Sequence, residues 1–196
     1  MVEPPEPLRL ATLDDVPAIR GLIDASVRVL SAGYYSDHEI ASSLRYVFGP
    51  DTQLIADATY YVIEADGAIV AAGGWSRRAT LYGGDQMKDT SDAVLDPARE
   101  AARIRAFFVH PAWTRRGLAR RLYEACAEAA RAGGFRELEL VSTLPGEPLY
   151  RAIGFTPIEE LVHVMPDGQR LRVIRMRKTL DDCGLRTASC ELRAPD

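Results

Sequence analysis

A short basic turn with one glycine is the stretch of this sequence best suited to chemistry. It runs from Thr114 to Ala119, between an apolar run that ends at Val109 and a helical pattern that begins at Leu118. The start of a helix carries unpaired backbone N–H groups and about half a positive charge. A glycine at that point lets a backbone and a ligand approach closely. The turn is therefore a candidate phosphate-binding site.

Arginines crowd the same helix start. They are Arg115, Arg116, Arg120 and Arg121. Cations at this end of a helix oppose its dipole, so a purely structural segment would favour Asp or Glu. A bound polyanion would explain the arginines. The alternative is a basic turn that is only solvated, because short motifs often match by chance.

The turn resembles the loop with which the GCN5-related N-acetyltransferases, the GNAT superfamily, bind the pyrophosphate of acetyl-CoA. That loop reads Arg/Gln-x-x-Gly-x-Gly/Ala between a strand and a helix. Gly117 and Ala119 match this pattern, whereas Thr114 departs from the usual first residue. A second family signature, Leu-Tyr-x-x-x-Gly-Phe at the end of a helix, resembles the stretch from Leu149 to Phe155. The resemblance covers residues 8 to 179.

The resemblance implies which residues handle acetyl-CoA. A backbone N–H around Phe108 or Val109 would polarise the thioester carbonyl as it becomes tetrahedral. Tyr150 would protonate the leaving CoA thiolate, and a phenol with a pKa of about 10 can donate to a thiolate whose acid has a pKa of about 8.5. The alternative for Tyr150 is an aromatic residue packed in the core. The implied acetyl-CoA contacts are Phe108, Val109, Arg115, Arg116, Gly117, Leu118, Ala119 and Arg120.

The sequence identifies no general base. Many relatives carry a Glu on the central strand, but the outward positions here are Arg103 and Arg105. Asp37 and Glu39 are the acids nearest to the expected pocket. Ser36 and Glu39 already form a capping-box pattern, which accounts for Glu39. Catalysis by positioning of two substrates, with water taking the amine proton, stays open.

Four residues are candidates for the acceptor pocket, although each also suits ordinary packing or a surface position. They are Tyr34, Tyr35, Trp75 and Arg105. The resemblance implies an enzyme that transfers an acyl group, typically acetyl, from acetyl-CoA to a primary amine of a small molecule or peptide by direct attack. The alternative is a non-catalytic acyl-CoA-binding sensor or interaction module, since no base is evident and Thr114 is unusual.

Apolar periodicity and turn residues predict the elements that would position these groups. On the strand over 102–109, alternation predicts two faces, the first with Ile104, Ala106 and Phe108, the second with Arg103, Arg105 and Phe107. The segment 77–100 is predicted to be a loop with at most one helical turn. The predicted strands are 8–11, 59–65, 68–75, 102–109, 137–142, 155–165 and 170–178, and the helices follow Thr12 and Ser36 and span 118–132 and 145–153.

The resemblance implies the fold class that these elements form. It is an α/β (α+β) GNAT fold, with a central mixed, mostly antiparallel sheet of six or seven strands and helices on both faces. One parallel pair of strands would splay apart at the CoA site. We expect one domain over residues 1–180 and a flexible tail over residues 181–196, since the tail lacks an apolar period.

Composition narrows the class of protein. A net charge of −4 argues against nucleic-acid binding. No apolar run is long enough for a membrane span, and no signal peptide is evident. The 3 cysteines lack metal-ligand spacing, so we expect a reduced, cytoplasmic protein without a metal. The oligomeric state stays open, with a homodimer among the alternatives.

Overall fold

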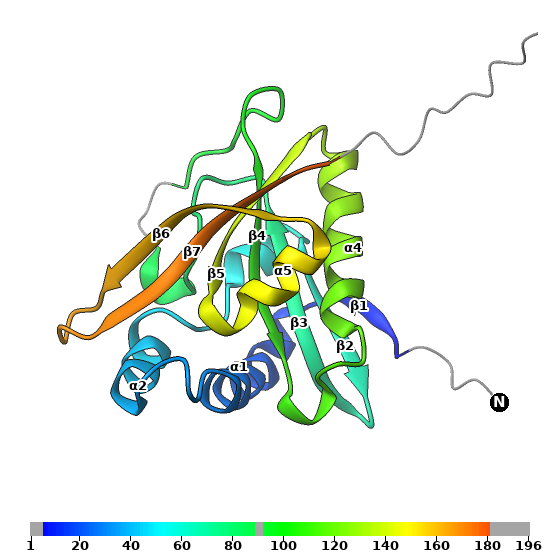
Figure 1. Cartoon of the computed structure of the whole chain (residues 1–196). Helices are drawn as coiled ribbons and strands as arrows, with labels where there is room; N and C mark the ends of the chain where they lie inside the picture. Colours follow the sequence, from blue (N-terminus) through cyan, green and yellow to red (C-terminus); the bar gives the residue numbers. More distant parts are fainter. Residues whose placement is uncertain (1–5, 89–91, 181–196) are drawn as a thin grey trace, which may run out of the picture.

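Figure 1 shows a computed structural model of the chain, which describes residues 6–88 and 92–180. Within these ranges, 7 strands form one sheet in the order β1-β2-β3-β4-β5-β7-β6. All neighbouring strands are antiparallel except β4 and β5. The strands are β1 (Leu8–Leu10), β2 (Tyr60–Ala65), β3 (Ala68–Ser76), β4 (Ala102–Val109), β5 (Glu137–Thr143), β6 (Thr156–Val164) and β7 (Arg170–Thr179). The predicted mixed, mostly antiparallel sheet with one parallel pair is confirmed.

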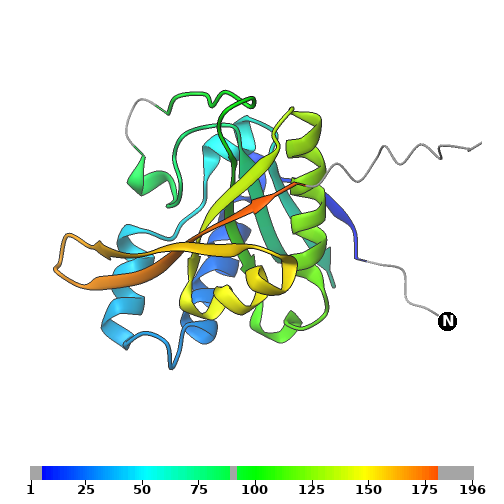
Figure 2. The ribbon, with the colours of Figure 1, turned by 45° about the horizontal axis from the view of Figure 1, so that its top comes forward.

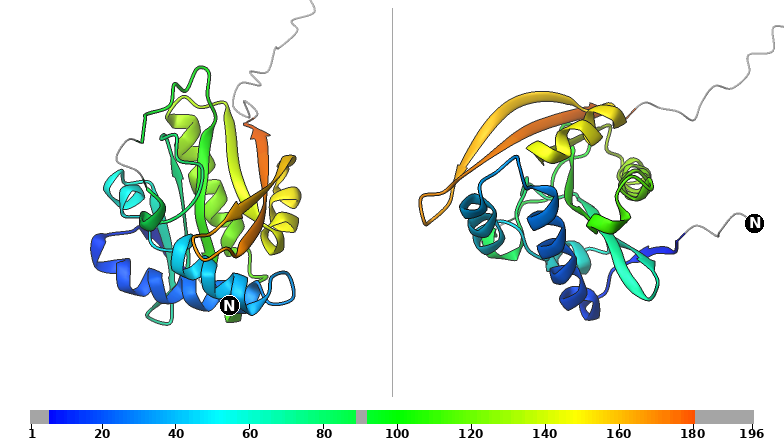
Figure 3. Two further views of the ribbon diagram at one scale, coloured as in Figure 1. Left: turned by 90° about the vertical axis from the view of Figure 1, so that its left-hand side faces the viewer. Right: turned by 60° about the horizontal axis from the view of Figure 1, so that its bottom comes forward.

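Helices cover both faces of this sheet, as Figure 3 shows. On one face lie α1 (Val16–Leu30) and α2 (Asp37–Tyr46), and on the other lie α4 (Leu118–Ala132) and α5 (Glu147–Ile153). The short α3 (Thr52–Ala56) leads into β2. Four 3-10 turns complete the described elements, namely η1 (Leu13–Asp15), η2 (Asp85–Met87), η3 (Pro111–Trp113) and η4 (Leu144–Gly146).

The capping pattern at the start of α2 forms as predicted. The Ser36 hydroxyl accepts a hydrogen bond from the Glu39 backbone N–H, and the Glu39 carboxylate accepts one from the Ser36 N–H at 2.8 Å. These two bonds give partners to two backbone N–H groups at the helix start that would otherwise have none within the helix. The carboxylate of Glu39 is committed to the helix start.

Each face of the sheet buries its own core. Under α1 and α2 the core includes Ile19, Ile23 and Val62, and under α4 and α5 it includes Cys126 and Leu140. All five side chains are at most 2% exposed. Cys126 is thus a small apolar core residue, and burial raises the pKa of its thiol.

The long connection between β3 and β4 is attached to the rest of the fold at several points. Arg78 forms an ion pair with Asp57, with Nε 2.6 Å from Oδ2. The Tyr82 hydroxyl lies 2.9 Å from Nδ1 of His163 on β6. Figure 2 shows this connection above the sheet and the β6–β7 hairpin extending to one side. The predicted single helical turn corresponds to η2.

A β-bulge interrupts β4 in its second half. The β3–β4 register jumps between Ala72 and Gly74, so Gly73 opposes two residues of β4, Ala106 and Phe107. Ala106 has a φ of 55°, in the left-handed region that L-residues rarely adopt. The extra residue reverses which side of the sheet each later side chain faces.

The predicted alternation along β4 is therefore wrong beyond Arg105. Ile104 and Phe107 pack into the core under α4 and α5, whereas Ala106 and Phe108 pack into the core under α1 and α2. Strict alternation would have placed Ile104 with Phe108. The physical cause is the bulge, which puts one more residue into β4 than the facing stretch of β3 holds.

Candidate active site

The parallel strands β4 and β5 pair only where they begin. Their ladder consists of Ala102 with Leu138 and Arg103 with Glu139. Beyond Arg103, the edge of β4 that faces β5 has no ladder partner among the described residues, as far as Val109. Backbone donors and acceptors on this edge are available to a ligand that enters between the strands. The structure thus contains the expected splayed pair.

A cluster of charges lies where the two strands part. Glu139 is 1% exposed. Its carboxylate is 3.3 Å from Nη1 of Arg103, 2.5 Å from Nε of Arg175 and 3.0 Å from Nη2 of Arg177. Burial alone would raise the pKa of Glu139, but the hydrogen bonds from Arg175 and Arg177 and the charge of Arg103 hold it below its usual value. The cluster joins β4, β5 and β7 at the closed end of the opening.

Glu139 was missed by the sequence analysis, although a signal for it exists. Glu137 and Glu139 alternate with leucines on one strand, and Arg175 and Arg177 have the same spacing on the strand beside it. Cross-strand pairing of opposite charges at period two is a recognisable pattern. It becomes informative only when the two strands are known to be neighbours.

The basic turn has the conformation of an anion-binding site. Arg115 and Gly117 both have left-handed φ values, 64° and 81°. Turns that mix right- and left-handed residues aim successive N–H groups into a concavity that suits an anion. No atom lies within 4 Å of the position a Cβ of Gly117 would occupy, so the space beside the turn is open. The helix α4 begins at Leu118, as predicted.

The arginines of the turn differ in their contacts. The Arg116 guanidinium stacks on the Trp113 ring at 4.3 Å, and Arg121 forms an ion pair with Glu6 at 3.0 Å. Arg115 and Arg120 are exposed. The Thr114 hydroxyl donates to the carbonyl of Pro111 at 3.1 Å, so it shapes the turn. The turn therefore retains exposed cations around its open concavity.

Tyr150 lies on α5 beside the opening. Its ring packs against Phe107 of the bulge, with centroids 6.4 Å apart, and against Phe155 at 5.8 Å. Within the described ranges, its hydroxyl makes no hydrogen bond to the protein. The hydroxyl is not one of the fully buried polar atoms that lack a partner, so it is at least partly accessible. Burial raises the pKa of the Tyr150 phenol, so the group is protonated at neutral pH.

The four predicted pocket residues do not converge. Trp75 packs under α4 with its ring 6.1 Å from that of Phe135, while Tyr35 belongs to the core on the opposite face. The Tyr35 hydroxyl donates to the carbonyl of Arg172 at 2.6 Å and accepts from an N–H of η4 at 2.9 Å. Tyr34 is 54% exposed and extends into solvent.

Arg105, the fourth of these residues, is buried in an ion pair. Its Nη2 lies 2.9 Å from Oδ2 of Asp51, and it also donates to the carbonyl of Gly83. Asp51 is fully buried, and Lys88 contacts its other carboxylate oxygen. Burial lowers the pKa of Arg105, an effect that the charge of Asp51 opposes. Arg105 and Asp51 thus attach the β3–β4 connection to the central strand.

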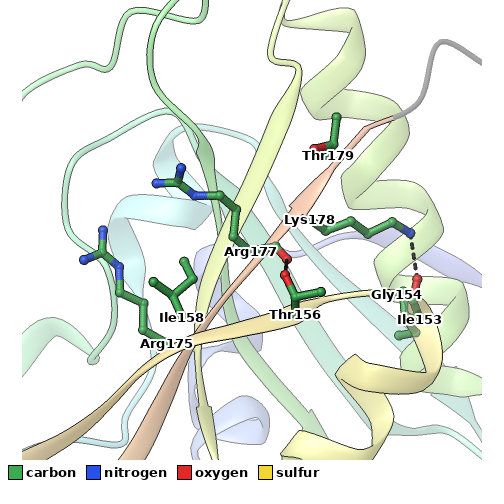
Figure 4. A pocket seen from close by; sticks show the side chains of 8 residues that line it. All are labelled: Ile153, Gly154, Thr156, Ile158, Arg175, Arg177, Lys178 and Thr179. Atoms are coloured by element: carbon green, nitrogen blue, oxygen red, sulfur yellow. Dashed lines mark hydrogen bonds between the residues drawn. The ribbon is translucent and has the colours of Figure 1, made fainter.

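A separate cavity of about 750 Å³ lies at the end of β7 (Figure 4). Its lining comprises Ile153, Gly154, Thr156, Ile158, Arg175, Arg177, Lys178 and Thr179. The Lys178 amine donates to the carbonyl of Ile153 at 2.7 Å, as Figure 4 shows. None of the residues predicted to bind acetyl-CoA or the acceptor lines this cavity, although it shares Arg175 and Arg177 with the charge cluster around Glu139.

Comparison with known proteins agrees with this geometry. The sequence model of the acetyltransferase (GNAT) family matches residues 26–155. The chain therefore belongs to the GNAT family. Its members transfer an acyl group from acetyl-CoA, so this protein is an acetyl-CoA-dependent acyltransferase with acetyl-CoA as co-substrate. The predicted class of enzyme and its co-substrate are confirmed, and the family match favours the enzyme over a non-catalytic module.

Solved structures share the fold at low sequence identity. A GCN5-related N-acetyltransferase from Rhodopseudomonas palustris is 19% identical, with a TM-score of 0.66 over 92% of this chain and 99% of that one. The PaiA N-acetyltransferase from Thermoplasma acidophilum, in complex with coenzyme A, is 14% identical, with a TM-score of 0.60 over 89% and 98%. The yncA protein from Salmonella typhimurium, with its cofactor acetyl-CoA, is 19% identical, with a TM-score of 0.58 over 90% of this chain and 94% of that one. The comparison with curated proteins found no match.

Two further properties concern the described residues alone. No group of three or more His, Cys, Asp and Glu side chains in this part of the chain is arranged to hold a metal ion. None of the helices in these ranges combines the length and the hydrophobicity that crossing a bilayer requires.

Proposed function

We propose that this enzyme transfers the acetyl group of acetyl-CoA to a primary amine of a small molecule or peptide by direct attack, with Tyr150 as general acid. The observation that carries the proposal is the place of Tyr150. Its ring packs on Phe107, at the bulge that borders the β4–β5 opening, and its hydroxyl has no hydrogen-bond partner within the described residues.

The basic turn would hold the donor. Backbone N–H groups from Arg115 to Arg120 would bind the pyrophosphate, and the left-handed φ values of Arg115 and Gly117 support this role. The exposed side chains of Arg115 and Arg120 add positive charge. Backbone groups on the unpaired edge of β4, among them those of Val109, would contact the pantetheine arm and polarise the thioester carbonyl. Phe108 lies beside them, with its own backbone directed toward β3.

The proposed reaction forms a C–N bond to the acceptor and breaks the C–S bond of the thioester. The neutral amine attacks the thioester carbon and forms a tetrahedral intermediate, whose oxyanion accepts hydrogen bonds from β4 N–H groups. The C–S bond then breaks, and the thiolate takes the phenolic proton of Tyr150. Water accepts the proton lost by the amine, and a proton from solvent restores Tyr150. Burial raises the pKa of the Tyr150 phenol, so the group still carries its proton when the thiolate forms.

The replacement of Tyr150 by Phe tests the proposal. This change removes one hydroxyl and little volume, so folding and acetyl-CoA affinity should hardly change. Turnover should fall about a hundredfold or more, in line with general-acid contributions of 10²–10⁴. The measurement is thiol release from acetyl-CoA across a panel of primary amines, with thermal stability recorded in parallel.

Tyr123 offers a matched control. It lies on α4, and its hydroxyl is buried without a hydrogen-bond partner among the described residues. Tyr123→Phe should leave turnover unchanged and stability equal or higher, because it removes an unpaired polar group. A stable Tyr150→Phe variant with normal turnover would show that another group or solvent protonates the thiolate.

A further inference from the structure

The β4 bulge places an aromatic ring directly over a glycine of β3. A Cβ built on Gly73 would lie 2.4 Å from Cδ1 and 2.6 Å from Cε1 of Phe107, which is closer than real Cβ atoms approach other atoms. Gly73 is not among the residues with a positive φ, so its backbone does not require glycine. The Phe107 ring requires it, because the ring occupies the space of the missing side chain.

The same ring contacts the proposed general acid. Phe107 and Tyr150 form a tilted pair at 49°, and Tyr150 in turn meets Phe155 edge to face at 76°. Both centroid separations are within the range of attractive aromatic contacts. Gly73, Phe107 and Tyr150 therefore form one contiguous packed row, and close-packed side chains transmit a displacement from one to the next.

We propose that Gly73 is a positioning residue for the acetyl transfer. By leaving room for the Phe107 ring, it sets where the Tyr150 phenol lies beside the β4–β5 opening. This inference rests on the proposed function of Tyr150. It assigns a role to a position that touches neither the basic turn nor the edge of β4 that faces β5, since Gly73 pairs with Tyr61 of β2 and opposes the bulge.

The adjacent glycine has a different role and provides the control. A Cβ on Gly74 would lie 2.7 Å from the carbonyl oxygen of Thr59 and 2.8 Å from the Tyr60 ring. Tyr60 belongs to the core under α1, on the face opposite to Tyr150. Gly73→Ala and Gly74→Ala thus introduce clashes at neighbouring positions of one strand. The first meets the ring that contacts the general acid, whereas the second meets a backbone carbonyl and the Tyr60 ring.

The test compares these two variants by kcat, KM and thermal stability. Gly73→Ala should lower kcat about tenfold to a hundredfold, as expected for a displaced catalytic group, and change the KM for acetyl-CoA little. Gly74→Ala should lower the melting temperature and leave the kcat of the folded protein unchanged. A folded Gly73→Ala variant with normal kcat, or an equal loss of kcat in Gly74→Ala, would overturn the inference.

A second substitution, at Phe107, distinguishes displacement of the aromatic ring from general destabilisation of the fold. In the Gly73→Ala background, Phe107→Ala removes all the ring atoms that meet the new methyl group, so kcat should rise above that of Gly73→Ala alone. In the wild-type background, the same change removes the support of the phenol, so kcat should fall. Opposite effects on kcat in the two backgrounds would identify Phe107 as the link between Gly73 and Tyr150. The same effect in both backgrounds would contradict the proposed packing of these three residues.

Failure of the inference and failure of the proposed function give different results. If Tyr150→Phe retains its turnover, the general-acid proposal is wrong, whatever Gly73→Ala does. If Tyr150→Phe is impaired but Gly73→Ala is normal, the general acid stands and the positioning role is wrong. If both hold, Gly73→Ala should cost little further kcat in the Tyr150→Phe background, since both changes act on the same hydroxyl.

Discussion

At the scale of single residues, burial decides what each ionisable group can do. The Tyr150 phenol is packed between two aromatic rings, and burial raises its pKa, so it is protonated at neutral pH. Glu139 is more deeply buried, at 1% exposure, yet three arginines keep it ionised. A carboxylate held in this way cannot readily accept a proton from an amine. We therefore assign Glu139 a structural role at the point where β4 and β5 part.

The replacement of Glu139 by Gln should destabilise the fold. It removes the carboxylate that pairs with Arg103, at a cost of about 1–3 kcal/mol. The value stays moderate because Arg175 and Arg177 are partly exposed and solvent screens them. Denaturant unfolding at neutral pH would measure it. Glu137→Gln is the control, since Glu137 is 40% exposed and 3.7 Å from Arg177.

The same pair of variants has a defined dependence on pH. Because the folded-state pKa of Glu139 is depressed, its contribution is fully present above its unfolded pKa of about 4.3 and is lost as the pH falls through the folded value. The stability difference between wild type and Glu139→Gln should therefore shrink in acid. A difference that stays constant from neutral pH into this range would argue that packing, not charge, stabilises the site.

At the scale of elements, the start of α4 carries features that weaken an isolated helix. Its N-cap is a glycine with left-handed φ, no side chain caps the first turn, and cations follow in Arg120 and Arg121. Each of these is unfavourable for helix stability, because the usual cap is Ser, Thr, Asp or Asn and the dipole favours acids. The pyrophosphate of acetyl-CoA, bound as proposed above, would supply the missing partner for the backbone N–H groups.

Gly117→Asp tests this element. The carboxylate would stand at the open concavity and repel the pyrophosphate, so acetyl-CoA affinity should fall about tenfold or more, as like charges a few ångströms apart predict. Calorimetry with acetyl-CoA is the measurement. Gly168→Asp is the matched control, because Gly168 in the β6–β7 turn also has a left-handed φ, 83°, and open space around it. Equal affinity in both variants would show that the turn does not bind the pyrophosphate.

At the scale of the whole molecule, the fold is one sheet with a core on each face, and its last described residue still belongs to a core. Leu180 is 6% exposed, and its N–H donates to the carbonyl of Arg136 at 2.8 Å. The predicted domain boundary at residue 180 thus coincides with a buried side chain. The predicted tail, 181–196, lies outside the described residues.

Truncation tests this boundary. A chain that ends at Leu180 should keep the melting temperature and the acetyl-CoA affinity of the full chain. A chain that ends at Thr179 should lose stability, by about 1.5–3 kcal/mol for the burial of one large aliphatic side chain. If removal of residues 181–196 already lowers the melting temperature by several degrees, those residues contribute to the fold or to an assembly.

The sequence by itself determined the local features of this protein. The bounds of β4 and α4, the capping box at Ser36 and the place of Gly117 at the start of α4 all follow from neighbours within a few residues. Hydrogen bonds within a helix turn or a cap connect residues that the sequence lists side by side, so their pattern is readable without a fold. The motif of the basic turn belongs to this group, and it led to the correct family.

Only the tertiary structure decided how distant residues meet. The bulge at Ala106 depends on the register between β3 and β4, and it moved Phe107 to the side of Tyr150. Trp75 and Tyr35 lie on opposite faces of the sheet, although either could have lined one pocket. The physical reason is that strand order and register are set by the packing of the entire sheet, and one added residue changes the face of every side chain beyond it.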